Sequence, residues 1–282
     1  MSESKISRSV DSYDPDESKL YLGYKDKDFE KPYAKYFNPN VELISDEVHK
    51  GLICSPWASG LGYEAHDAHD HLLRPGYLAI ENGFVKTKNG TMMVAVRTNM
   101  GQVTGEAYDW WFSWHSTDSS RYKLWHPHAH QYSWRHPDTL EVSNKSYAER
   151  YINTFSFINE YIGNHSAQLT VAFIDPAELG INKEKWPALG IETMVCAKIS
   201  GPGGLLIICS EQGHITEGFD GVSYLIHQIR RRPDGARELR SRFWLAKADD
   251  GAARGLMVHC AMEMSHLAKF LPQLFAEFKE DV

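Results

Sequence analysis

The histidines of this chain gather in short segments, and their spacing indicates metal chemistry. The sequence has 14 His among 282 residues, and histidine is the commonest metal ligand in proteins. The four Cys are dispersed without a C-x-x-C pair, which excludes a zinc ribbon. A metal site in this chain would therefore be built from histidine and carboxylate.

His259 and Glu263 form the first candidate pair. They are spaced i, i+4 in a segment whose apolar residues recur at helical spacing, so both side chains lie on one helix face, a turn apart. That spacing lets one metal ion be held by an imidazole and a carboxylate. The alternative interpretation is a His and a Glu on a solvated helix face, or a salt bridge between them.

A second cluster comprises His126, His128 and His130. At this spacing the three side chains would point the same way on a strand, although Pro127 favours a loop or an edge strand. Three imidazoles so close together would repel one another if protonated, so metal binding or neutral packing is plausible. With the helical pair, this cluster favours a mixed His/carboxylate site, which with an open position is what a catalytic zinc needs.

Two further features have weaker support. The segment from His66 to His71 partly resembles the H-x-H-x-D-H motif of metallo-β-lactamase-type hydrolases, but Ala68 takes the place of the middle His. We therefore favour polar surface residues there. Cys260 directly follows His259 and could be a thiol nucleophile, although a buried, inert Cys is the commoner case.

The elements that must position these residues are consecutive strands followed by one long helix. An Asn-Gly turn joins the first two expected strands, and Thr104 is a plausible N-cap for a helix over 104–115. The expected strands are 77–87, 91–97, 168–174, 192–199, 205–210, 224–231 and 238–246. The segment 251–279 is amphipathic, and Pro272 should kink or divide it. Without βαβ alternation or G-x-G-x-x-G, this order predicts an α+β fold: a curved antiparallel sheet that grips the helix around a ligand cavity.

Composition excludes several classes of protein. The formal charge of −7 disfavours nucleic-acid binding. The longest apolar runs are far too short to span a bilayer, and Met1 to Asp16 lacks the apolar stretch of a secretory signal. Dispersed Cys favour reduced thiols, so we expect a cytoplasmic protein. We divide the chain into a small helical or irregular N-terminal region, 1–72, and a main domain, 73–282.

Taken together, several segments resemble one family. The run from Asp109 to His115 and the run from Arg121 to His130 look like the signature of the 2,4-diacetylphloroglucinol hydrolase and phloretin hydrolase family. The runs 74–77, 81–84 and 240–244 and the pair His259 and Glu263 add to this resemblance, which covers about residues 73 to 275.

The resemblance implies a helix-grip (Bet v 1-like) fold with a small N-terminal domain, and a Zn²⁺ held by two His and two Glu. Carried over to this sequence, the ligands would be His130, His259 and Glu263, with Glu160 as the fourth. Glu149 is the runner-up for that fourth position.

The same resemblance implies residues that act on the substrate. Tyr122 matches a tyrosine that binds a ring hydroxyl, and Ser133 matches a polar position that contacts substrate in some members. A later His and a second Tyr are also expected: His214 and Tyr224 are our candidates, and His227 competes with His214. Trp111 is our candidate for the pocket wall, because tryptophans concentrate beside the second His cluster.

The implied activity is hydrolysis of the carbon–carbon bond between an acyl group and a polyhydroxylated aromatic ring. The substrate would be a small phenolic ketone, such as 2,4-diacetylphloroglucinol or phloretin, and the enzyme a homodimer. Two alternatives stay open: a non-catalytic helix-grip carrier of an aromatic or polyketide ligand, and another metallohydrolase of phenolic ketones. The sequence does not choose between the two substrates.

Overall fold

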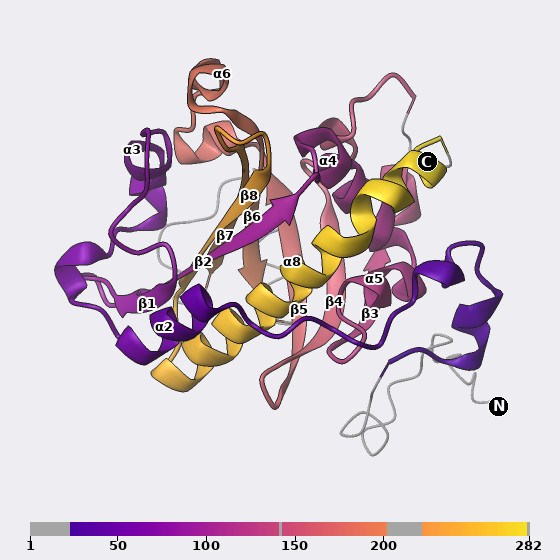
Figure 1. The fold of residues 1–282 in the computed structure, drawn as a ribbon, viewed down its shortest axis with the longest axis horizontal. Helices are drawn as coiled ribbons and strands as arrows, with labels where there is room; N and C mark the ends of the chain where they lie inside the picture. The colour runs from indigo at the N-terminus through magenta and orange to yellow at the C-terminus, as the bar shows by residue number, and fades with distance from the viewer. Residues whose placement is uncertain (1–22, 141–142, 202–221, 281–282) are drawn as a thin grey trace, which may run out of the picture.

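A computed structural model describes residues 23–140, 143–201 and 222–280 of the chain. Its centre is a curved sheet of eight antiparallel strands in the order β1-β2-β8-β7-β6-β5-β4-β3 (Figure 1). The strands are β1 (Gly83–Lys86), β2 (Met92–Gly101), β3 (His130–Arg135), β4 (Phe155–Ile162), β5 (His165–Ile174), β6 (Ile191–Ser200), β7 (Ser223–Arg231) and β8 (Arg237–Leu245).

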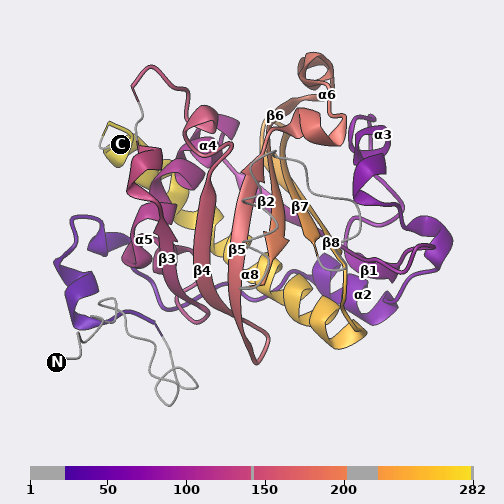
Figure 2. The same cartoon turned by 180° about the vertical axis from the view of Figure 1, so that it is seen from behind.

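Helices lie on both sides of this sheet, as the view from behind also shows (Figure 2). The α-helices are α2 (Asp46–Cys54), α3 (Ala68–Leu72), α4 (Gly105–Trp114), α5 (Ser119–Trp125), α6 (Trp186–Leu189) and α8 (Asp250–Phe278). The short 3-10 helices are η1 (Asp26–Glu30), η2 (Ala34–Tyr36), η3 (Ser59–Leu61), η4 (Ala65–Asp67), η5 (His115–Thr117), η6 (Pro137–Leu140), η7 (Ala148–Arg150), η8 (Pro176–Leu179) and η9 (Lys183–Lys185).

The predicted hairpin and the predicted capped helix are both present. β1 and β2 pair with Lys86 opposite Met92, and Gly90 in the connecting turn has φ of 90°, a conformation that glycine adopts without strain. The Thr104 side chain accepts a hydrogen bond of 3.1 Å from the backbone N–H of Ala107 and so caps α4. The first strand is shorter than predicted, because 77–82 do not join the sheet.

Helix α8 lies along the concave face of the sheet (Figure 1). Its buried face repeats at helical spacing, which is why the sequence pattern predicted it correctly. Of the two predicted effects of Pro272, division of the helix is wrong, since one helix runs past it to Phe278, and a kink stays a prediction. Proline removes a single backbone hydrogen bond, and Phe270, Leu271 and Leu274 still pack into the core around it.

These elements confirm the predicted α+β fold with a sheet that grips a C-terminal helix. Two strands at the far side of the sheet, β3 and β4, were not predicted, and the expected strand 205–210 lies outside the described residues. Among the helices that the structure describes, none combines the length and the apolar character needed to cross a membrane.

The described part of the N-terminal region packs on the same core as the sheet. Tyr33 and Val48 are buried with residues of β2, α4 and α8, and the Tyr33 ring meets the Trp114 ring edge-on at 5.1 Å. The division at residue 72 stays a prediction, although this shared core ties the two parts together.

A second buried layer covers the outer face of β2, β8, β7 and β6. Ala68 and Leu72 of α3 pack there against Trp244. Beside them Glu81 binds two fully buried arginines, with Glu81 oxygens 2.7 Å from Arg240 Nη2 and 2.5 Å from Arg242 Nη2. Charges buried in this way are tolerated only when they are paired. The ion network therefore fixes the segment before β1 onto β8.

Replacing Glu81 with Gln should lower the free energy of unfolding by about 3 kcal/mol at pH 7, because two buried guanidinium groups lose their counter-ion. Burial raises the pKa of Glu81, but Arg242 and Arg240 outweigh it and lower that pKa from 4.5 to about 2. The contribution of a carboxylate with a depressed folded-state pKa is complete above its usual pKa and is lost as pH falls through the depressed value. Urea unfolding between pH 7 and pH 2 should show that the wild type loses this part of its free energy of unfolding. The Glu81→Gln variant has no carboxylate at this position and should lack that part at every pH.

The control is Glu47→Gln, because Glu47 is largely exposed and lies 3.2 Å from Arg97. An exposed ion pair contributes about 0.5 kcal/mol or less. Equal destabilisation by the two variants would contradict a structural role for the Glu81 network.

Candidate metal centre and active site

Four side chains from three distant parts of the sequence meet beneath α8. His130 Nε2 lies 3.4 Å from the His259 Nε2, 3.4 Å from an oxygen of Glu160 and 3.4 Å from an oxygen of Glu263. His259 Nε2 is 3.8 Å from Glu160 and 3.6 Å from Glu263. All four residues are buried. His130, Glu160 and His259 have the mutual spacing of metal ligands, and the Glu263 oxygen beside both imidazoles would add a second carboxylate.

The sheet and the helix place these groups by simple rules. His130 begins β3 and stands opposite Glu160 of β4 in the strand register, so their side chains share one face. His259 and Glu263 lie one turn apart on the face of α8 that looks at the sheet. The tertiary packing of α8 on the strands then brings the two pairs together.

Tyr122 supports this cluster from α5. Its backbone carbonyl accepts a hydrogen bond of 3.0 Å from Nδ1–H of His130, which leaves the Nε2 lone pair free toward the cluster. The Tyr122 ring stacks on the His130 ring at 3.8 Å and 6°, and its hydroxyl donates to Glu160. Tyr122 thus orients one imidazole and one carboxylate at once.

The burial of the cluster shifts the pKa of its members. Desolvation lowers the pKa of His130 well below its usual value, and His259 and His126 lower it further. Desolvation raises the pKa of Glu263 well above its usual value, and Glu160 adds to that rise. The pocket therefore disfavours uncompensated charge, and a bound cation would supply the compensation.

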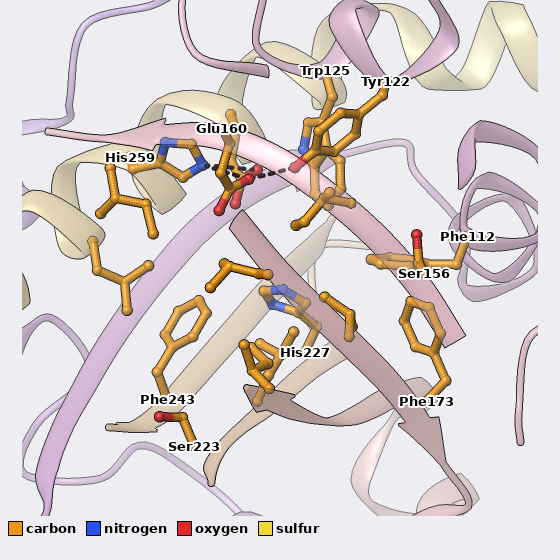
Figure 3. A pocket seen from close by; sticks show the side chains of 18 of the residues that line it. Phe112, Tyr122, Trp125, Ser156, Glu160, Phe173, Ser223, His227, Phe243 and His259 are labelled. Carbon is orange, nitrogen blue, oxygen red and sulfur yellow. Dashed lines mark hydrogen bonds and ion pairs between the residues drawn. The ribbon is translucent and has the colours of Figure 1, made fainter. Parts of the chain in front are cut away.

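An apolar cavity of about 190 Å³ opens beside the cluster, between the sheet and α8. Figure 3 shows Tyr122, Glu160 and His259 together at one end and His227, Phe243 and Phe173 further along. Its wall is mainly aliphatic and aromatic: Phe112, Trp125, Ile158, Ile162, Leu169, Val171, Phe173, Ile199, Leu225, Phe243, Leu245 and Leu256. A cavity of this kind suits a flat, mostly apolar ligand with a few polar groups.

His227 is a further polar group in this wall. Its Nδ1 lies 2.7 Å from the hydroxyl of Ser241, and burial lowers its pKa to about 3. The imidazole is therefore neutral near pH 7, and the ring nitrogen that does not face Ser241 can form a hydrogen bond with a ligand.

Comparison with known proteins identifies the family. The family model described as "DAPG hydrolase PhiG domain" matches residues 64–249. The chain belongs to this family. It is 30% identical to 2,4-diacetylphloroglucinol hydrolase of Pseudomonas protegens over 92% of this chain and 89% of that protein. It is 29% identical to phloretin hydrolase of Eubacterium ramulus over 70% of this chain and 72% of that protein. The resemblance identified from the sequence is confirmed.

These relatives also confirm the predicted enzyme class, a hydrolase acting on carbon–carbon bonds, over the alternative of a non-catalytic carrier. Among solved structures, Ara h 8.0201 covers 65% of this chain at 10% identity with a TM-score of 0.38. A norcoclaurine synthase point mutant covers 61% at 8% identity with a TM-score of 0.33. These scores are too low to argue from, so the fold assignment rests on the strand order and α8.

In this DAPG hydrolase family member, the structure brings together five of the residues named from the sequence: His130, Glu160, His259, Glu263 and Tyr122. The runner-up Glu149 lies on an exposed turn, where it accepts hydrogen bonds from Ser146, and is not part of the cluster.

Other predicted substrate residues do not face the cavity. Tyr224 is on the opposite face of β7 from Ser223, Leu225 and His227, because side chains alternate along a strand, and its ring packs near His66 at 5.6 Å. The structure therefore places Tyr224 in the outer layer, and its predicted role stays a prediction. His214 lies outside the described residues.

Trp111 and Ser133 are also buried away from the cavity wall. The Trp111 ring stacks on His115 at 4.9 Å behind the wall. The Ser133 hydroxyl donates to the backbone carbonyl of Ser116, at 3.3 Å. Neither residue lines the cavity, so their predicted contact with substrate stays a prediction that this geometry does not favour.

The alternative metal clusters are not assembled. His126 stacks on His259 at 4.9 Å and supports it, while His128 is exposed and its Nε2–H donates to the carbonyl of Pro39. Within the described residues, His66 and His71 belong to no group of metal-ligand spacing. Burial raises the pKa of the Cys260 thiol well above its usual value, which disfavours a nucleophilic thiolate.

Replacing His259 with Ala should weaken the binding of one divalent cation at least about 100-fold. Removing a residue that only supports a metal ligand already lowers metal affinity about 10- to 100-fold, and removing the ligand itself should lower it further. Isothermal titration with Zn²⁺, after treatment with a chelator, would measure this change. His66→Ala is the matched control, because His66 is exposed on η4, and it should bind as the wild type does. Equal weakening in both variants would contradict the assignment of the site.

Proposed function

We propose that this protein is a zinc-dependent hydrolase that cleaves the bond between an acyl carbon and a polyhydroxylated aromatic ring. Its substrates would be acylphloroglucinols such as 2,4-diacetylphloroglucinol or phloretin, the compounds in the names of its relatives. The observation that carries the proposal is the buried His/Glu cluster, with Tyr122, at one end of an apolar cavity. The homodimer and the cytoplasmic location stay predictions.

The donor atoms fit zinc. Tetrahedral Zn²⁺ with bonds of 2.0–2.1 Å to nitrogen and oxygen has ligand atoms about 3.4 Å apart. The five separations that involve an imidazole nitrogen of His130 or His259 run from 3.4 to 3.8 Å. Neutral imidazoles with carboxylates are also the ligand types of catalytic zinc sites. When bound, zinc would act as a Lewis acid that polarises an oxygen of the substrate or of water.

The residues of the chain account for the organic steps. The bond can break once the ring carbon that carries the acyl group is protonated, as happens when the phenol becomes its keto tautomer. Water then adds its oxygen to the acyl carbon, and the bond electrons return to the ring. The products are a carboxylic acid and the deacylated phenol, so the atoms of one water are divided between them.

Tyr122 would bind and orient a ring hydroxyl, because it lines the cavity and its own hydroxyl donates to Glu160. His227 would move the proton from a ring hydroxyl to the ring carbon through the ring nitrogen that does not face Ser241. The apolar wall excludes bulk water, which strengthens these polar contacts. His214 stays a predicted acid–base residue outside the described part of the chain.

Wild-type protein loaded with zinc should convert 2,4-diacetylphloroglucinol or phloretin to the deacylated phenol. Liquid chromatography would measure the appearance of this product. Tyr122→Phe should reduce kcat at least about 100-fold, because a positioned hydroxyl is lost where charge develops. Zinc binding should stay within about 100-fold of wild type, as expected for a residue that supports the ligands. Turnover of neither compound would refute the proposed substrate class.

A second pair of variants tests which face of β7 is used. His227→Gln should lower kcat by about 100-fold or more, the usual contribution of a proton-transfer group. Tyr224→Phe changes the outer face of the same strand and should leave kcat within about twofold. The reverse order of effects would show that our assignment of faces is wrong.

A further inference from the structure

The end of the cavity away from the metal cluster carries polar groups that the proposed reaction does not use. Ser156, Ile158 and Glu160 alternate along β4 and all line the cavity. Ser156 is four residues from Glu160, about 13 Å along the strand at 3.3 Å per residue. Figure 3 shows Ser156 beside Phe112, on the side away from His259.

The Ser156 hydroxyl is buried and has no hydrogen-bond partner among the described residues. Most buried hydroxyls in proteins are paired, and an unpaired one is costly. A serine at this position in an otherwise apolar wall therefore points to a partner that arrives with the ligand.

Two more polar groups flank Ser156. Arg135 stands opposite it in the strand register, is buried, and has an Nε–H without a partner. Within the described residues no carboxylate pairs with Arg135; its guanidinium contacts the Ser116 hydroxyl at 3.4 Å and the Thr139 carbonyl at 3.2 Å. Arg135 does not itself line the cavity; its buried guanidinium lies next to the Ser156 wall only through the strand register.

His115 adds a hydrogen-bond acceptor to the same wall. Its Nδ1–H donates to the Trp111 carbonyl at 2.7 Å, and burial lowers its pKa to about 3. The ring is therefore neutral and its Nε2 carries a lone pair. His115 lines the cavity with Ser156, and its ring lies 5.3 Å from the Phe112 ring and 5.8 Å from the Tyr122 ring. It therefore offers an acceptor between the metal cluster and the end of the cavity that carries Ser156.

We propose that this end of the cavity binds a phenolic hydroxyl at the far end of the substrate's acyl chain. The inference rests on the proposed function and deepens it: the preferred substrates are acylphloroglucinols whose acyl group ends in a hydroxylated aromatic ring. Such a ring would pack against the edge-to-face pair Phe112 and Phe173, and its hydroxyl would exchange hydrogen bonds with Ser156 and His115. A short acetyl group would leave those groups unpaired.

The test compares phloretin with the dihydrochalcone that lacks only the hydroxyl on the phenylpropanoyl ring, together with 2,4-diacetylphloroglucinol. Wild-type enzyme should prefer phloretin over the deoxy compound at least about tenfold in kcat/KM, since a site built for a hydroxyl rejects the analogue without it. Ser156→Ala should bring this ratio close to one and leave kcat/KM for 2,4-diacetylphloroglucinol within about twofold. Its thermal stability should not fall, because the hydroxyl has no partner in the folded protein.

Ser223→Ala is the matched control. Ser223 also lines the cavity, but it lies beside Phe243 on the side away from Ser156 (Figure 3), and this variant should keep the wild-type preference. Equal turnover of phloretin and the deoxy compound by the wild type, or an equal loss for all three substrates in Ser156→Ala, would overturn this inference while the proposed function stands. Turnover of none of the three by the wild type would instead refute the proposed function.

Discussion

The structure depends on one costly arrangement: two carboxylates and two imidazoles buried together at the end of an apolar cavity. Glu160 and Glu263 share one site, where desolvation and mutual repulsion raise the pKa of Glu263. Buried charge of this kind is strongly unfavourable unless it is paired or coordinates a metal. A cation bound by all four side chains removes the conflict, and the surrounding architecture serves to hold the four donors in place.

That architecture holds the cluster from both sides of the sheet. On the concave side, α4 and α5 pack tryptophans and Tyr122 behind the ligands, with Trp110 and Trp114 stacked at 4.9 Å. On the outer side, the Glu81 network fixes the segment before β1 to β8. Helix α8 therefore packs on a sheet that is covered on both faces. This rigid packing fixes the distances between His259 and Glu263 on the helix and His130 and Glu160 on the strands.

Local patterns in the sequence predicted the elements that local forces determine. The Thr104 cap, the Asn-Gly hairpin and the periodicity of α8 are all short-range signals, and the structure contains each of them. β3 and β4 were missed because the Trp-His-Pro run before His130 signals a loop. Their residues also alternate poorly in polarity, since β4 presents Ser156 and Glu160 to the cavity. These polar positions belong to the site, so the polarity pattern did not predict the strand that carries functional residues.

The site was predicted in part for the same reason. His259 and Glu263 form a local helical pair, whereas the meeting of His130 with Glu160 depends on a strand register that no spacing reveals. β7 is buried on both faces, so its sequence does not show whether Tyr224 or His227 points inward; in the structure His227 lines the cavity and Tyr224 packs in the outer layer. Ser156 and His115 carried no signal, because a single serine or histidine in an apolar run is ordinary.

The most direct test of the account is anomalous X-ray diffraction at the zinc absorption edge from crystals of the protein grown with Zn²⁺. We predict one strong peak within bonding distance of His130, Glu160, His259 and Glu263, about 2 Å from each donor. A peak at another group of side chains, with none among these four in protein that hydrolyses its substrate, would contradict the central claim.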